Sequence, residues 1–326
     1  MAGRILVTGG AGYLGSALVA ELVGNGEAVT VMTGPDDLAA QPGGLGRDVE
    51  VVRADVTDES SVDVAMRGIS QVYHLAGIAS PNSRLAHAIW NANVLGTYHV
   101  AQSALRNGVQ RVIHVSSTAA IGYPADDVVA DEQFDVRDSV LDNVYAATKR
   151  AGERVMLDFV VRGLDAVVVN PAAVFAPASG PARSWQGLLT AARRGLLRGV
   201  PPGGTAVCSA RDFVIGATAA MVKGASGERY ILSSANLTYR RIAELLVEAV
   251  GRNHRVRTLP MGLLRAAGAG NRVVRDLAGT ARHDDALVPE NVELMARHVY
   301  YTSGKAEREL GIPRVSTSEL ITEFTR

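Results

Sequence analysis

The 326-residue sequence predicts a doubly wound α/β fold, in which a parallel sheet is covered by helices on both faces. Short β-branched runs alternate with longer amphipathic stretches through the first half of the chain. These runs lack the strict apolar and polar alternation of a half-exposed sheet, which favours strands that are buried on both faces. After residue 170, prolines and glycines break the chain into shorter elements, which predicts a smaller, loop-rich C-terminal part.

The expected strands are the β-branched runs at residues 4–8, 28–32, 49–53, 71–75, 111–116 and 165–170. The expected helices in the same half lie near residues 13–24, 58–67, 82–107 and 140–162. Where a helix follows a strand, its first turn should lie at the carboxyl edge of the sheet, where open α/β sheets bind ligands. Beyond residue 170 we expect one strand at 227–232 and helices near 185–198, 212–223, 238–250, 289–297 and 303–310.

The composition excludes several classes of protein. Hydrophobic residues make up 47% of the chain and charged residues 20%, which excludes a disordered chain, and the formal net charge is zero. No basic tail or arginine-rich block is present, so nucleic acid is not an expected partner. Cys208 is the single cysteine and the seven histidines show no ligand spacing, so we expect neither disulfides nor a metal site. The N-terminal apolar stretch is too short for a signal peptide or a membrane span, which favours a cytoplasmic protein without a membrane partner.

Glycines at positions 9, 12 and 15 lie between the first strand and the first helix. Small residues there let backbone N–H groups approach a pyrophosphate, and the helix N-terminus supplies partial positive charge. The order of strand, glycine turn and helix therefore predicts a dinucleotide-binding site. The third and fourth strands end on the same edge, at Asp55 and at Leu75, Ala76 and Gly77, and these ends either line that site or are plain turns.

The end of the second strand bears on which dinucleotide is bound. An NAD site usually has an acid there, which accepts a hydrogen bond from the ribose 2′-hydroxyl. Here Thr33 and Gly34 stand at the strand tip, and the first acid, Asp36, follows a proline that is expected to turn it away. We therefore expect a slight preference for NADP(H) over NAD(H), with Arg47 or Arg53 beside the additional phosphate.

A serine, a tyrosine and a lysine have the spacing of a proton-transfer site. Ser117 follows a strand end, and Tyr145 and Lys149 share one face of a predicted helix. A nearby ammonium and an oxidised nicotinamide both favour the phenolate, so Tyr145 would pass a proton to or from a carbonyl oxygen that Ser117 also hydrogen-bonds. A second YxxxK, from Tyr301 to Lys305, lacks such a serine, and we expect no catalytic role for it.

At these residues the sequence resembles the extended short-chain dehydrogenase/reductase superfamily. The resemblance rests on TGGAGYLG at 8–15, on Ser117, Tyr145 and Lys149, and on NPAAVFAP at 170–177. It implies a set of cofactor contacts, namely Gly9, Gly12, Tyr13, Leu14, Gly15, Asp55, Val56, Lys149, Pro171 and Val174. The stretches at 211–213, 227–232 and 305–311 look like the dihydroflavonol-reductase-like branch of the superfamily, in which Asp212 would cap a helix.

The domain division expected from these patterns is a Rossmann domain over residues 1–170 that binds the dinucleotide. Residues 171–326 would form mainly a substrate-binding domain, with segments near 205–235 returning to the first domain. The resemblance also implies a homodimer, because the family places the helices near 82–107 and 140–162 against their symmetry mates. The apolar residues available for that contact are Val94, Tyr98, Leu105, Val155, Phe159 and Val160.

Three functions remain open at this point. The favoured one is an NAD(P)H-dependent ketoreductase or dehydrogenase that acts on a carbonyl or secondary alcohol of a medium-sized, partly apolar metabolite. The first alternative is a nucleotide-sugar epimerase, which would hold NAD tightly and consume none. A redox-sensing binding protein is less favoured, because such proteins commonly lack the tyrosine. Ala119 and Ala120 stand where 4,6-dehydratases have an Asp-Glu pair, so water elimination is not expected.

Overall fold

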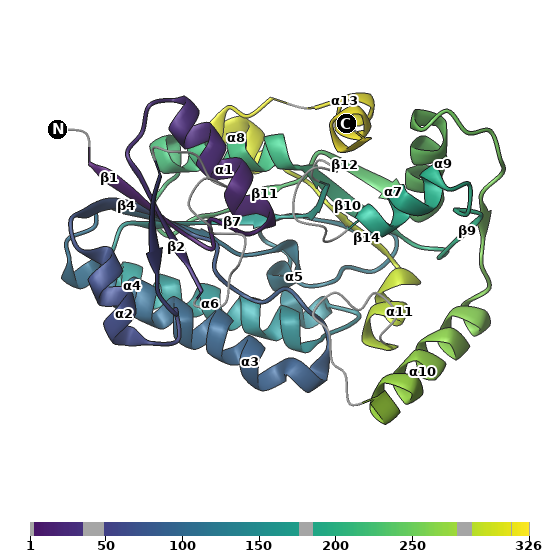
Figure 1. Cartoon of the computed structure of the whole chain (residues 1–326), viewed down its shortest axis with the longest axis horizontal. Helices are drawn as coiled ribbons and strands as arrows, with labels where there is room; N and C mark the ends of the chain where they lie inside the picture. The colour runs from purple at the N-terminus through teal and green to yellow at the C-terminus, as the bar shows by residue number, and fades with distance from the viewer. Residues whose placement is uncertain (1–2, 35–48, 176–184, 279–288, 314, 326) are drawn as a thin grey trace.

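A seven-stranded parallel sheet forms the centre of the computed structural model, which describes residues 3–34, 49–175, 185–278, 289–313 and 315–325 (Figure 1). The strand order is β11-β7-β5-β4-β1-β2-β3, and every neighbouring pair is parallel. The strands are β1 Arg4–Thr8, β2 Val29–Thr33, β3 Val49–Arg53, β4 Ile69–His74, β5 Arg111–Val115, β7 Ala166–Pro171 and β11 Arg229–Leu232. This order and the helices on both faces confirm the predicted doubly wound α/β fold.

The strands show no apolar and polar alternation because both of their faces are buried. In β1, Ile5 and Val7 pack into one hydrophobic core, whereas Leu6 points to the other face and packs into a second core. All three side chains are at most 3% exposed. Apolar residues at every position stabilise a strand that is buried on both faces, and β1 has this pattern.

Two layers of helices cover this sheet (Figure 1). One layer holds α1 Tyr13–Gly24, α8 Ala210–Lys223 and α12 Gly304–Leu310. The other holds α2 Glu59–Met66, α3 Ala86–Trp90, α4 Gly96–Arg106 and α6 Val144–Val161. Leu18 of α1 and Phe213 of α8 pack into the core on the first side, and Met156 and Phe159 of α6 pack into the core on the second.

The helix expected over residues 82–107 is divided into segments of different hydrogen-bonding pattern. A short 3-10 turn, η2 Ser83–Leu85, precedes α3, and a π-helical segment, η3 Asn91–Leu95, separates α3 from α4. A π-turn inserts an extra residue into the helix and is frequently found at functional sites. It shifts the side chains that follow it relative to those of a regular helix, which residue spacing alone does not predict.

A second, mixed sheet lies beside the first, and most of its strands come from the C-terminal half of the chain (Figure 1). Its strands are β6 Val129–Ala130, β8 Ala173–Phe175, β10 Gly204–Ser209, β12 Ala235–Thr238 and β14 His298–Tyr301. Helices α7 Gln186–Arg193, α9 Tyr239–Ala249 and α13 Thr317–Thr325 pack around a third core, in which the rings of Phe175 and Phe324 lie 4.9 Å apart. The sequence pattern does not predict the strands of this sheet or the helix α13.

Six further elements complete the described part of the chain. They are the helices α5 Thr118–Ile121, η4 Val136–Asp138, α10 Met261–Ala278 and α11 Pro289–Met295, and the paired strands β9 Gly199–Val200 and β13 Arg257–Thr258. The segment near 205–235 contributes to both sheets, because β10 belongs to the second sheet whereas α8 covers the first and β11 completes it.

The expectation that Asp212 caps a helix is wrong. Helix α8 begins earlier than predicted, and Ser209 is its N-cap, with the Ser209 hydroxyl accepting from the Asp212 amide at 2.9 Å. The Asp212 carboxylate instead accepts a hydrogen bond from the hydroxyl of Ser234. Both serine and aspartate favour N-cap positions, so the sequence pattern could not decide between them.

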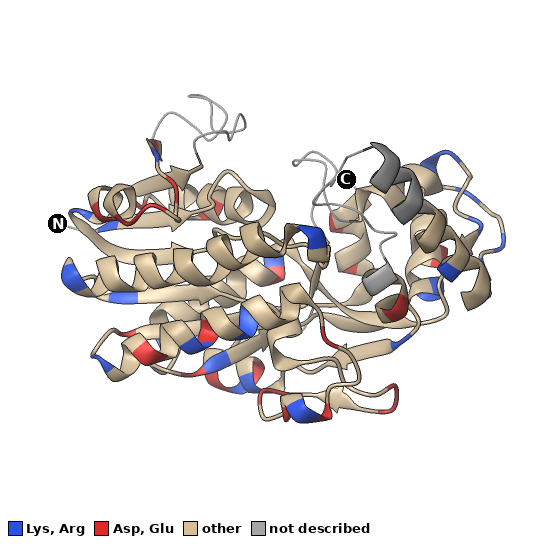
Figure 2. Cartoon of the chain, turned by 90° about the horizontal axis from the view of Figure 1, so that it is seen from below, with Lys and Arg blue, Asp and Glu red and all other residues tan. Residues whose placement is uncertain are grey.

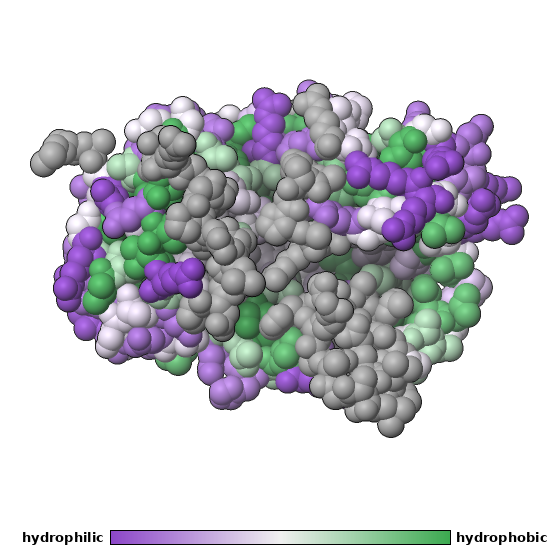
Figure 3. All heavy atoms as spheres, in the orientation of Figure 1, coloured by the Kyte–Doolittle hydropathy of each residue, from purple (hydrophilic) through white to green (hydrophobic). Residues whose placement is uncertain are grey.

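Acidic and basic residues are interspersed along the helices and loops, without one large block of either sign (Figure 2). On the face shown in Figure 3, hydrophobic residues appear as separate patches between hydrophilic ones. None of the helices in the described ranges combines the length and the apolar character needed to cross a membrane.

Candidate functional site

The glycine turn between β1 and α1 forms a cradle with an open side. Gly9 has a φ of +69°, and a Cβ there would lie 2.9 Å from the Ala76 amide nitrogen, so this position requires glycine. A Cβ at Gly15 would lie 2.6 Å from the Gly10 Cα. At Gly12, by contrast, a Cβ would meet only the Gly9 carbonyl oxygen, at 3.1 Å. Gly12 is also the N-cap of α1 and brings no capping side chain, so the positive end of the helix fits a pyrophosphate.

The other sequence-predicted contacts surround this turn. The Thr8 hydroxyl accepts from the Ala76 amide at 3.2 Å, which joins the ends of β1 and β4. Asp55 holds its own turn by accepting from the Thr57 amide at 2.8 Å. The Tyr13 hydroxyl donates to the Val174 carbonyl at 3.1 Å and so connects the glycine turn to β8 of the second sheet.

The tip of β2 retains an unsatisfied polar group. Thr33 is 2% exposed, and its hydroxyl has no hydrogen-bond partner among the described residues. Arg53 stands beside Thr33 in the register of β2 and β3. Asp36 and Arg47, which the sequence analysis also considered, lie outside the described residues.

The structure brings Ser117, Tyr145 and Lys149 together at the end of β5. Ser117 is the N-cap of α5, and its side chain lies beside that of Tyr145. Tyr145 and Lys149 lie one turn apart near the start of α6. The Lys149 ammonium donates to the Val115 carbonyl at 3.1 Å, which fixes it beneath the strand end that carries Ser117.

Burial is the main cause of the pKa shifts of Tyr145 and Lys149. It raises the pKa of Tyr145, and the neighbouring Ser117 side chain opposes that shift. Burial lowers the pKa of Lys149 to about 8, and the charge of Glu153 opposes that shift. The pKa of Tyr145 is therefore raised, because the effect of burial outweighs that of Ser117. A bound oxidised nicotinamide would add the further positive charge that favours the phenolate.

Asn93 is a site residue that the sequence analysis missed. It lies in the π-helical segment, accepts from the Ile78 amide at 2.8 Å and donates to the Thr148 hydroxyl at 3.1 Å. A Cβ at Gly77 would lie 2.7 Å from the Asn93 side-chain oxygen and 3.7 Å from the Lys149 ammonium nitrogen. Gly77 therefore allows Asn93 and Lys149 to approach the end of β4, which no spacing in the sequence indicates.

The second YxxxK lies in different surroundings. The Tyr301 hydroxyl donates to the Gly122 carbonyl. Lys305 pairs with Glu228 and donates to the Arg229 carbonyl at 3.0 Å. Each residue is thus held by its own partner in a structural contact. No cluster of potential metal ligands occurs among the described residues.

Comparison with known proteins identifies the family. A sequence model for the NAD dependent epimerase/dehydratase family matches residues 5–232. The chain belongs to this family. Sterol demethylase protein B of Methylococcus capsulatus is 30% identical, with 96% of this chain and 94% of that protein aligned. The 4-hydroxy-2-methyl-3-oxo-4-farnesyl-3,4-dihydroquinoline-1-oxide ketoreductase of Stigmatella aurantiaca is also 30% identical, with 94% and 91% aligned.

Among solved structures, a UDP-glucose 4-epimerase of Thermotoga maritima has the same fold. It superposes with a TM-score of 0.77 over 99% of this chain and 97% of that one, at 22% identity. These findings confirm the resemblance to extended short-chain dehydrogenases/reductases. The protein is accordingly an NAD(P)-dependent oxidoreductase of that type, and its cofactor is a nicotinamide dinucleotide.

We expect Gly12→Val to abolish dinucleotide binding without unfolding the protein. The valine side chain would occupy the open side of the glycine turn, where a Cβ meets only one carbonyl oxygen. Gly24→Val is the matched control, because a Cβ at Gly24 meets nothing within 4 Å. Cofactor titration by fluorescence, with thermal melting to verify folding, provides the measurement. Undiminished affinity in Gly12→Val would disprove the cradle.

Proposed function

We propose that this protein is an NAD(P)H-dependent ketoreductase or dehydrogenase, which transfers hydride between nicotinamide and a carbonyl or secondary alcohol. The observation that carries the proposal is the contact between Ser117 and Tyr145 above the buried ammonium of Lys149. This group lies at the strand edge that also holds the glycine turn. A carbonyl oxygen placed between the two hydroxyl groups would have two hydrogen-bond donors and one source of a proton.

In the reductive direction, Ser117 donates a hydrogen bond to the carbonyl oxygen and Tyr145 gives it a proton. In the oxidative direction, Tyr145 removes the proton of the alcohol. Lys149 bonds the nicotinamide ribose and stabilises the phenolate by its charge. The nicotinamide, when bound, supplies or accepts the hydride. The residues that we propose to hold the dinucleotide are Gly9, Gly12, Tyr13, Leu14, Gly15, Thr33, Asp55, Val56, Leu75, Ala76, Gly77, Tyr145, Lys149, Pro171 and Val174.

The segment after Ser117 supports reduction rather than elimination. Ala119 and Ala120 are both buried and neither can transfer a proton, so the elimination of water has no acid and base at this point. The name of the ketoreductase relative from Stigmatella aurantiaca describes reduction of a keto group in a farnesylated compound. This relation supports a partly apolar carbonyl substrate for the present protein.

We propose that residues 171–326 mainly form the substrate side, together with the loops at 78–90 and 119–140. Of the aromatic residues near these loops, Tyr123 is buried and Trp185 packs on Phe175, with their ring centroids 4.9 Å apart. Trp90 is 43% exposed, so it is more available to a substrate than either of them.

Nucleotide-sugar epimerisation is the alternative function. The fold of the Thermotoga maritima epimerase and the stretch Arg211-Asp212-Phe213 are compatible with it. Such an enzyme retains NAD and regenerates it in every cycle. Chromatography of the nucleotide released from denatured protein distinguishes the two functions, since stoichiometric NAD after purification supports an epimerase. For a reductase we expect no retained stoichiometric NAD and net oxidation of added NADPH by a ketone panel.

Tyr145→Phe is expected to bind cofactor within a few-fold of the wild type and to lose about 100- to 10,000-fold in turnover. The ring still packs, whereas the transferable proton is gone. Tyr98→Phe on α4 is the control, because Tyr98 packs against Phe159 away from Ser117. The measurement is NADPH oxidation with the most active ketone of the panel. Wild-type turnover in Tyr145→Phe would refute the proposed function.

We also propose a preference for NADP(H), supported by Arg53 beside Thr33 and by the Thr33 hydroxyl, which has no hydrogen-bond partner among the described residues. Arg53→Gln should weaken NADPH binding about tenfold, the scale of one hydrogen bond to a charged group, and leave NADH binding unchanged. Arg67→Gln, a change at another exposed arginine, serves as the control. Equal losses for both cofactors, or none, would contradict a role of Arg53 at the 2′-phosphate.

The homodimer remains a proposal. Phe159 is buried in its own chain, and Tyr98, Leu105, Val155 and Val160 are partly buried against the same core. Their remaining surface on α4 and α6 is what a partner would cover. We expect sedimentation equilibrium at micromolar concentration to give about twice the chain mass of 34.3 kDa. A single species at the chain mass would show that the protein is a monomer.

A further inference from the structure

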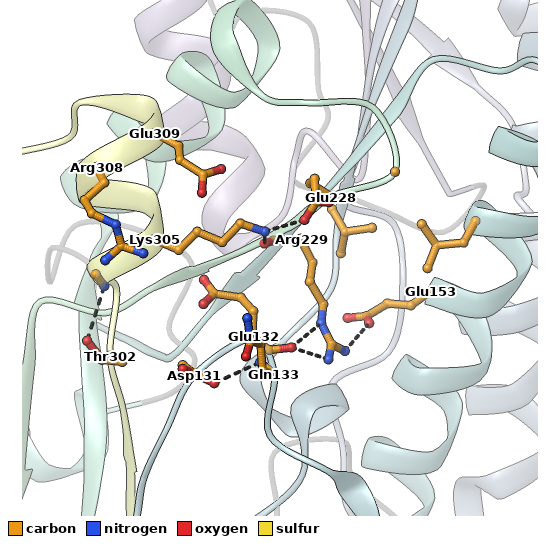
Figure 4. Close-up of a pocket in the computed structure, with 14 residues that line it drawn as sticks. Asp131, Glu132, Gln133, Glu153, Glu228, Arg229, Thr302, Lys305, Arg308 and Glu309 are labelled. Carbon is orange, nitrogen blue, oxygen red and sulfur yellow. Dashed lines mark hydrogen bonds and ion pairs between the residues drawn. The ribbon is translucent and has the colours of Figure 1, made fainter.

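A cavity of about 480 Å³ lies at the edge strand β11 of the central sheet, between α6, α12 and the loop around residue 132 (Figure 4). Its lining is largely charged and includes Asp131, Glu132, Glu153, Glu228, Arg229, Lys305, Arg308 and Glu309. Several of these residues are exposed, so the cavity reaches the surface, whereas Glu153 is only 4% exposed. Glu153 thus lies in a buried part of the cavity wall.

Glu153 also belongs to the helix that carries the proposed catalytic pair. It lies one turn after Lys149 on α6. Its carboxylate accepts a hydrogen bond from the Asn170 side-chain amide, which donates in addition to the Ser117 carbonyl at 2.9 Å. The carboxylate is therefore connected to Ser117 through Asn170 and faces the charge of Lys149 along the helix.

On the cavity side, Arg229 approaches the same carboxylate. Its guanidinium lies 3.7 Å from a Glu153 oxygen, and its Nε donates to the Glu132 carbonyl at 3.0 Å (Figure 4). The Glu132 carboxylate in turn accepts from the Ile231 amide at 2.8 Å, which anchors this loop to β11. Arg229 is thereby fixed in a position from which it faces Glu153.

We propose that Glu153 is a positioning residue for Ser117 and Lys149, and that Arg229 holds its carboxylate from the cavity on the far side. The proposal rests on the proposed function for the roles of Ser117 and Lys149. It assigns to the cavity a part in setting the charge of the active site, through a residue that is not among the proposed cofactor contacts. Arg229 would act on Lys149 only through Glu153.

Four polar or charged groups among the described residues face the Glu153 carboxylate. Lys149 faces Glu153 from its own helix, Arg229 from β11, Asn170 from β7 and the Ser116 hydroxyl from the end of β5. Burial raises the pKa of Glu153, and these four groups oppose that shift.

Two buried histidines also lie near Lys149, on β4 and β5. Burial and the lysine charge lower the pKa of His74 to about 3 and keep the pKa of His114 well below its usual value. Both rings are therefore neutral at physiological pH. Glu153 is the group that opposes the lowered pKa of Lys149.

The sign of the expected effect follows from these charges. An ionised Glu153 favours the ammonium form of Lys149, so its removal should lower the Lys149 pKa further. Removal of Arg229 should favour the neutral form of Glu153 and so lower the Lys149 pKa in the same direction, by less.

The chain contains only three lysines, at 149, 223 and 305, so the Lys149 pKa can be measured directly. Protein labelled with ¹³C-lysine gives few side-chain NMR signals, and Lys149→Arg identifies the signal of interest. We expect Glu153→Gln to lower the Lys149 pKa by about one unit and Arg229→Gln to lower it by less. Arg308→Gln, a matched arginine change in the same cavity, should leave it unchanged.

An unchanged Lys149 pKa in Glu153→Gln would overturn the proposal, as would equal shifts in Arg229→Gln and Arg308→Gln. If Glu153→Gln fails to fold, the Arg229→Gln variant alone tests the proposal. An unaltered Lys149 pKa in Arg229→Gln would then refute the connection between the cavity and Lys149. The titration requires neither substrate nor cofactor. Its failure would leave the proposed function standing, and failure of Tyr145→Phe to lose turnover would leave this charge coupling standing.

Discussion

Burial of the central sheet on both faces is the constraint from which the arrangement of the site follows. Strands such as β1 have apolar residues on both sides, so no polar group in their middle is available to a ligand. Polar groups are left at the strand ends, where Thr33 and Ser117 stand. The parallel direction places these ends at one edge, beside the N-terminus of α1. The glycine turn and the group of Ser117, Tyr145 and Lys149 thereby become neighbours without long loops.

Much of this arrangement could be predicted from the sequence, because the strands of the central sheet are short apolar runs and their ends are marked by glycine or serine. The second sheet was not predicted, since a strand such as β10 pairs with β8, β12 and β14 from distant parts of the chain. Ser117, Tyr145 and Lys149 form a recognisable pattern, and the structure brings them together. Asn93 became part of the site only through the π-turn and Gly77, which local spacing does not encode.

A series of buried hydrogen bonds connects β1, β4 and the π-helical segment next to the site. The Thr8 hydroxyl and His74 lie 2.8 Å apart, the other nitrogen of His74 lies 3.1 Å from the Thr97 hydroxyl, and Thr97 donates to the Asn93 carbonyl at 2.7 Å. The series runs from the strand that precedes the glycine turn to the π-helical segment. Because His74 is neutral and bonded at both ring nitrogens, it links these elements without placing another charge near Lys149.

The contact between Tyr13 and Val174 joins the two halves of the protein at the cofactor cradle. Tyr13 begins the helix that would receive the pyrophosphate, and Val174 lies in β8 of the second sheet. A single neutral hydrogen bond contributes about 1 kcal/mol, or roughly a factor of five in an equilibrium. Such a bond breaks readily in thermal motion yet biases the two sheets towards contact. The two sheets also share a hydrophobic core, so loss of this bond would loosen their contact beside the cradle without separating them.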